Sequence, residues 1–135
     1  MKKLQLFRRD NRGATAVEFA LIIPVFFGML IGITQLGSLY FAGADLRNSV
    51  AAGARKAQIF PRPAPAEVTA AVRNRIFKLN SAYLTGPTVT QGTDANGYAF
   101  YLIEASYAVP LNFVFFKTPP VTLTESRRVY LNPTS

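Results

Sequence analysis

Glu18 is the residue whose type and position point most directly to a specific chemical task. Its carboxylate stands directly before an uncharged stretch that runs from Phe19 to Ala44. Such a charge is costly to bury at the start of an apolar helix, so it usually has a partner. In one interpretation Glu18 sits at the headgroup level of a membrane and pairs loosely with Arg12. In the other, a cut between Gly13 and Ala14 creates an α-ammonium four residues before Glu18, on the same helix face. The residues alone leave both interpretations open.

Catalytic and metal-binding groups are sparse. The chain has neither histidine nor cysteine, which excludes Ser–His–Asp and Cys–His sites and argues against a typical zinc site. Asp94 and Asn96 resemble a fragment of a calcium loop, but the missing closing glutamate favours a turn. Glu104 and Glu125 could form a carboxylate pair if their strands are neighbours, although no second catalytic feature accompanies them. Since no phosphate loop or nucleotide fingerprint is present either, we expect no enzyme, no cofactor and no metal.

Positive charge is concentrated at the N-terminus. The net charge is +8, and five basic residues fall among the first thirteen, namely Lys2, Lys3, Arg8, Arg9 and Arg12. Such an arm could bind nucleic acid or form the cytoplasmic flank of a membrane segment. Because it runs straight into the apolar stretch, the positive-inside rule favours the flank, with no nucleic-acid partner. We therefore expect a single-pass inner-membrane protein with a cytoplasmic N-terminus and residues from about Asp45 outside.

The apolar stretch predicts a helix that crosses the lipid. From Phe19 to Ala44 it would measure about 39 Å, more than the roughly 30 Å of a hydrocarbon core. The helical pattern continues with a stripe at Leu46, Val50, Gly53 and Ala57. The prolines from 61 to 65 must end it. The sequence thus predicts a membrane helix and stalk over residues 14–58, and a stiff linker over 59–65.

The remaining residues, 66–135, predict a small head. A second helix is expected from about Ala66 to Tyr83, with an apolar stripe at Val68, Val72, Ile76, Leu79 and Tyr83. Strands are expected over residues 88–91, 98–109 and 121–131, because the pattern changes to alternation. Phe113 to Phe116 could contact a partner subunit or the membrane, although core burial is favoured. The predicted fold class is α+β: a long membrane and stalk helix, a second helix and a three-stranded antiparallel sheet.

Three residues of the apolar stretch suggest helix packing. Pro24 removes one backbone donor and predicts a kink near Ala20, although membrane helices tolerate proline. Gly28 and Gly32 form the Gly-x-x-x-Gly spacing that lets membrane helices approach closely. The small and polar residues from Thr34 to Ser38 also suit helix–helix contact better than lipid.

The run from Arg12 to Pro24 resembles the N-terminus of TadE-like minor pilins, which belong to the tight-adherence (Flp) branch of type IV pili. In that family a prepilin peptidase removes a short basic leader after a glycine. A glutamate is the fifth residue after the cut, so Gly13 and Glu18 match both positions. The resemblance implies a leader over residues 1–13 and a type IV pilin-like layout, with residues 66–135 as an extracytoplasmic head.

The resemblance also implies a function. The chain would be a minor pilin, or pseudopilin, that acts in assembly, priming or tip formation of a pilus for surface adherence. Its partners would be the prepilin peptidase, other minor and major pilins, and the inner-membrane assembly platform. Glu18 would be buried in the filament, and pairing with the Ala14 ammonium would make that burial tolerable.

Other functions remain open at this stage. Ala42-Gly43-Ala44 resembles a secretory cleavage site, which would release an exported binding module beginning at Asp45. The apolar stretch, however, is longer than the roughly 7–15 residues of a signal core. A membrane-anchored periplasmic binding module, an envelope enzyme and a DNA-binding membrane protein are the further alternatives. The N-terminus of the mature chain separates these possibilities.

Overall fold

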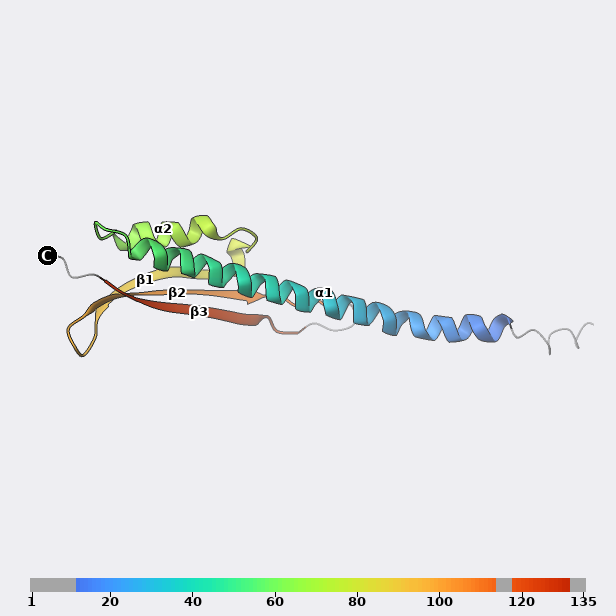
Figure 1. Cartoon of the computed structure of the whole chain (residues 1–135). Helices are drawn as coiled ribbons and strands as arrows, with labels where there is room; N and C mark the ends of the chain where they lie inside the picture. Colours follow the sequence, from blue (N-terminus) through green and yellow to red (C-terminus); the bar gives the residue numbers. More distant parts are fainter. Residues whose placement is uncertain (1–11, 114–117, 132–135) are drawn as a thin grey trace, which may run out of the picture.

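A single helix, α1 (Arg12–Ala57), contains both the apolar stretch and the amphipathic stretch that follows it. The computed structural model describes residues 12–113 and 118–131. In Figure 1 the first half of α1 projects alone, whereas its second half lies in the head between α2 and the sheet. Pro24 lies inside α1 without ending it. The predicted continuation of the apolar stretch as one helix into the amphipathic stretch is confirmed, with its end at Ala57 rather than near Gln58.

The second helix, α2 (Pro65–Arg75), is shorter than the sequence predicts. It begins with Pro65 at its first turn, where a missing N–H costs nothing. It ends because Ile76 turns to an extended conformation, and the carboxylate of Asp45 then accepts the N–H groups of Phe77 and Lys78 at 3.1 and 3.2 Å. The expectation of a helix as far as Tyr83 is therefore wrong. A short 3-10 turn, η1 (Ser81–Tyr83), takes its place.

Three antiparallel strands form the sheet, in the order β1-β2-β3. They are β1 (Leu84–Thr93), β2 (Ala99–Val109) and β3 (Val121–Tyr130). The first strand is longer than the predicted 88–91, because the pairing passes over Gly86 and Pro87 with a register shift between Thr85 and Thr88. Gly86 has a φ of 88°, which a side chain would strain.

Both helices cover one face of the sheet, α1 over β2 and β3, and α2 over β1. The predicted α1 stripe is buried in this core, with Leu46, Val50 and Ala57 at most 3% exposed. The alternating face of β2 is also confirmed as buried: Tyr101, Ile103, Ala105, Tyr107 and Val109. From the predicted stripe of the second helix, Val68 and Val72 are buried. The fold class is thus the α+β arrangement that the sequence predicts.

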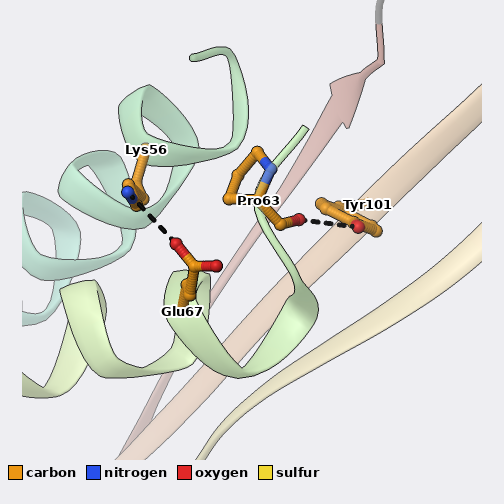
Figure 2. Close-up of polar contacts among 4 residues, drawn as sticks. All are labelled: Lys56, Pro63, Glu67 and Tyr101. Carbon is orange, nitrogen blue, oxygen red and sulfur yellow. Dashed lines mark hydrogen bonds and ion pairs between the residues drawn. The ribbon is translucent and has the colours of Figure 1, made fainter. Parts of the chain in front are cut away.

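Two polar contacts hold the distal end of α1 and the segment that follows it against the rest of the head (Figure 2). The buried Tyr101 hydroxyl donates to the Pro63 carbonyl at 3.0 Å. Lys56 Nζ lies 3.3 Å from Glu67 Oε2, and both side chains are partly exposed. The first contact ties the segment between the helices to β2, because a buried carbonyl needs a donor. The second links α1 to α2 at the surface.

Candidate functional site

The candidate site is the half of α1 that the head leaves uncovered. Large apolar side chains there are well exposed; for example, Phe19 is 64%, Leu21 71% and Met29 64% exposed. This helix is long and apolar enough to cross a membrane, and its most apolar window has no buried residue. Soluble proteins rarely leave such a surface in water. This exposed apolar surface is suited to contact with lipid or with other apolar helices.

Gly13, Ala14 and Glu18 lie in the first turns of α1, and all three are exposed. Ala14 and Glu18 are four residues apart in a continuous helix, which places them on the same face one turn apart. In the uncut chain the Ala14 nitrogen is a peptide amide and carries no charge. The charge pair predicted from the sequence therefore needs the cut after Gly13, and it stays a prediction.

The packing residues Gly28 and Gly32 lie on the same uncovered half. A β-carbon added at Gly32 would meet nothing within 4 Å, and the same is true at Gly37. Gly32 and Gly37 are therefore not required by packing within the described part of the chain. Their small size is available to a neighbouring helix, which is the role that the Gly-x-x-x-Gly spacing predicts.

The polar side chains at the C-terminal end of the apolar stretch each donate to a backbone carbonyl. Thr34 Oγ1 donates to the Ile31 carbonyl at 2.8 Å, and Ser38 Oγ donates to the Thr34 carbonyl at 3.0 Å. Gln35 Nε2 donates to the carbonyl of Asn112 at 2.9 Å, a contact that the sequence analysis missed. The one signal for it was an amide side chain within an apolar stretch. These bonds let polar residues lie close to lipid, because each bonded group has a partner other than water.

The other candidates do not form a site. Asp94 Oδ1 accepts the N–H groups of Asn96 and Tyr98 at 2.9 and 2.8 Å, so this segment is the predicted turn. Within residues 12–113 and 118–131 no cluster of three metal-ligating side chains is present. Among the described residues, the exposed apolar half of α1 is therefore the candidate functional site.

Glu104 and Glu125 are not paired. Glu104 stands opposite Ser126, and Glu125 stands opposite Ala105. Because successive side chains alternate between faces, the two carboxylates point to opposite sides of the sheet. The possibility of a carboxylate pair is therefore wrong, although their strands are indeed neighbours.

Two further sequence candidates lie near the head. Ala42 is buried, and a β-carbon at Gly43 would lie 3.7 Å from Leu123 Cδ1. The alternative secretory site thus falls inside the packed part of α1. Phe113 is half-buried, whereas residues 114–117 lie outside the described residues.

Comparison with known families identifies the stretch that carries these features. Residues 13–55 match the family model described as TadE-like protein. This part of the chain is TadE-like. The match begins at Gly13, includes Glu18 and both packing glycines, and ends near the end of α1. The TadE-like family is associated with Tad pilus systems. No curated protein and no solved structure shows a significant match to the chain.

The similarity to the TadE-like family is confined to residues 13–55. It covers the uncovered half of α1 and the part packed in the head, but neither α2 nor the sheet. The family match therefore corresponds to the long apolar helix. The TadE-like chain has one long apolar N-terminal helix, consistent with a single-pass membrane anchor.

Proposed function

We propose that this TadE-like chain is a minor pilin, or pseudopilin, of a Flp-type (tight-adherence) pilus, with a structural rather than a catalytic role. One observation carries the proposal. The family match falls on a helix whose first half is apolar and uncovered by the chain's own head. Such a helix is suited to two environments in turn, the lipid bilayer and a filament core made of similar helices.

The exchange between these environments is energetically feasible. Lipid tails and a core of packed apolar helices are about equally apolar, so the transfer changes the hydrophobic free energy little. Association then depends on close packing between helices. Among the described residues, nothing lies within 4 Å of a β-carbon added at Gly32 or Gly37. Both positions are therefore suited to close contact with a neighbouring helix.

Glu18 supplies specificity in this proposal. A carboxylate in a filament core is unfavourable unless a cation pairs with it. Removal of residues 1–13 by a prepilin peptidase creates such a cation at Ala14, either of the same subunit or of a neighbour. A subunit out of register would leave Glu18 unpaired, so the pair favours correct packing.

Orientation and partners follow from the same proposal. The basic residues before Gly13 keep the N-terminus in the cytoplasm, and the head lies on the outer side of the inner membrane. The proposed partners are the prepilin peptidase, the other minor and major pilins, the inner-membrane assembly platform and membrane lipid. Within the pilus system the chain would act in assembly, priming or tip formation for adherence.

The mass of the mature chain tests the proposal. The protein is purified from the membranes of cells with and without the prepilin peptidase, and its intact mass is measured. We expect a chain that starts at Ala14 in the first cells and at Met1 in the second. A start at Asp45 would instead support an exported module, and a start at Met1 in both would leave an uncut anchor.

The variant Gly13→Leu tests the cleavage site within this chain, in cells that contain the peptidase. Among the described residues, nothing lies within 4 Å of a β-carbon added at Gly13, so we expect the substitution to preserve the head and to block cleavage after residue 13. We expect this variant to remain uncut. Gly37→Leu is the control, because a β-carbon at Gly37 also meets nothing within 4 Å but lies far from the cut.

A further inference from the structure

The height of the head above the membrane can be derived from α1. A hydrocarbon core of about 30 Å takes roughly 20 helical residues. Counted from Phe19, the first residue after the Glu18 charge, the core ends near Ser38. This estimate rests on the proposal that α1 is the membrane anchor.

The head contacts α1 at a residue that comes before Ser38, where the hydrocarbon core ends. Gln35 donates to the carbonyl of Asn112, so this loop of the head reaches the level of Gln35, about one turn inside the estimated edge. This bond gives the Gln35 amide a partner in the chain at a level where water is scarce. The head therefore contacts α1 down to the lipid boundary on this side.

Exposed aromatic side chains lie at the same end of the head. Tyr40 and Phe41 of α1 are each 78% exposed. They follow Ser38 by two and three residues, which is about 3 to 5 Å, whereas the headgroup layer is roughly 5 to 7 Å thick. These rings are therefore at headgroup level, where aromatic residues are enriched in membrane proteins.

The segment after α2 places an aromatic and a basic residue, Phe77 and Lys78, at the same end of the head. In Figure 1 the chain after α2 turns at the end of the head nearest the free half of α1. Phe77, which is 83% exposed, is held there by the bond from its N–H to Asp45, one helical turn beyond Phe41 on the same face of α1. Asp45 follows Ser38 by seven residues, about 10 Å along α1, so the Phe77 backbone lies just above the headgroup layer and its exposed ring is the part that can reach that layer. Lys78 lies beside it, with its ammonium 5.8 Å from the centre of the Phe77 ring.

The strands place Tyr83 at a similar height. Leu84, the next residue, pairs with Tyr107, and Tyr107 pairs with Leu123. Leu123 in turn lies against Gly43, two residues after Phe41. Tyr83 is 45% exposed. Four exposed aromatic residues therefore lie at the end of the head nearest the apolar half of α1, and we call them the aromatic rim: Tyr40, Phe41, Phe77 and Tyr83.

We propose that the head is seated on the lipid surface, with Tyr40 and Phe41 in the headgroup layer, the rings of Phe77 and Tyr83 reaching its outer side, and Lys78 facing anionic headgroups. The continuity of the rim with the membrane helix selects lipid as its occupant. An aromatic ring beside an ammonium also matches a layer that is apolar on one side and anionic on the other. Seating restricts the tilt of the head relative to the membrane.

Tryptophan reporters test the seating directly, because the chain contains no tryptophan of its own. The full chain is reconstituted in phosphatidylglycerol vesicles that contain brominated lipids, which quench only nearby indoles. Phe77→Trp is the decisive variant, and Phe41→Trp reports the helix at the boundary. Tyr98→Trp is the control, because Tyr98 is 60% exposed at the β1–β2 turn, at the end of the sheet away from the membrane helix.

We expect quenching to fall in the order Phe41→Trp, Phe77→Trp, Tyr98→Trp, with Phe77→Trp quenched at least about two-fold more than the control. Equal, weak quenching of Phe77→Trp and Tyr98→Trp would overturn the seating. The added change Lys78→Gln should lower the quenching of Phe77→Trp in these vesicles but not in neutral phosphatidylcholine. An unchanged value would overturn the anionic contact. This experiment needs no pilus, so its failure is distinct from failure of the proposed function.

Discussion

Gly53 of α1 and Val72 of α2 lie so close that a β-carbon at position 53 would collide with Cγ2 of Val72. Gly53 is buried in the stripe that packs α1 into the head. The missing side chain lets the two helices approach each other. This contact, far from the membrane, holds α2 against the helix that carries the family match.

Gly53→Ala should therefore destabilise the head. The extra methyl group overpacks a tight contact, which costs roughly 1 to 3 kcal/mol. Denaturant unfolding of the full chain in detergent, followed by tyrosine fluorescence, measures the change. The double variant Gly53→Ala, Val72→Ala should lose less than the two single variants added together, because the collision is relieved. Simple additivity would show that the two residues do not restrain each other.

Tyr101→Phe tests the buried contact of Figure 2. The change keeps the ring but removes the hydroxyl, so the buried Pro63 carbonyl loses its donor, at a cost of about 1 to 3 kcal/mol. Glu67→Gln is the matched control. It weakens the partly exposed ion pair with Lys56, which should cost less than about 1 kcal/mol. The same unfolding experiment compares them, and an equal loss would contradict this ranking.

Glu18→Gln tests the charge pair of the proposed function. The side chain keeps its size but loses its charge, so membrane insertion should be unchanged while pilus assembly falls. A lost pairing of about 1.4 kcal/mol already changes an assembly equilibrium tenfold. Counting pili by electron microscopy, with membrane fractionation in parallel, measures both effects. Glu67→Gln again serves as the control, and normal piliation by the Glu18 variant would count heavily against the pair.

Gly32→Ile tests the helix-packing role. Because a β-carbon at Gly32 meets nothing within 4 Å in residues 12–113 and 118–131, the head should remain as stable as before. A branched side chain would still prevent a neighbouring helix from approaching closely, so the chain recovered with filaments should fall several-fold. Leu36→Ile, on the same exposed half of α1, is the control. If both variants enter filaments equally well, close packing at Gly32 is unnecessary.

Much of the fold was predictable because it depends on local patterns. The change from helical spacing to alternation marks where helices give way to strands, and burial follows the stripe of Leu46, Val50 and Ala57. The features of the candidate site, Gly13, Glu18 and the two glycines, were equally visible, since they lie within one helix. The Gln35 contact was not, because its partner Asn112 is 77 residues further along the chain.

By itself, therefore, the sequence determined the long apolar helix, the alternating face of β2 and the α+β class, because side-chain spacing sets which face of an element avoids water. Tertiary structure alone decided where α2 ends, because the Asp45 carboxylate comes from another helix to accept the N–H groups of Phe77 and Lys78. It also decided that Glu104 and Glu125 face apart, because strand register depends on pairing between distant segments. Contacts of this kind have no local signal, since they form only when separate elements meet.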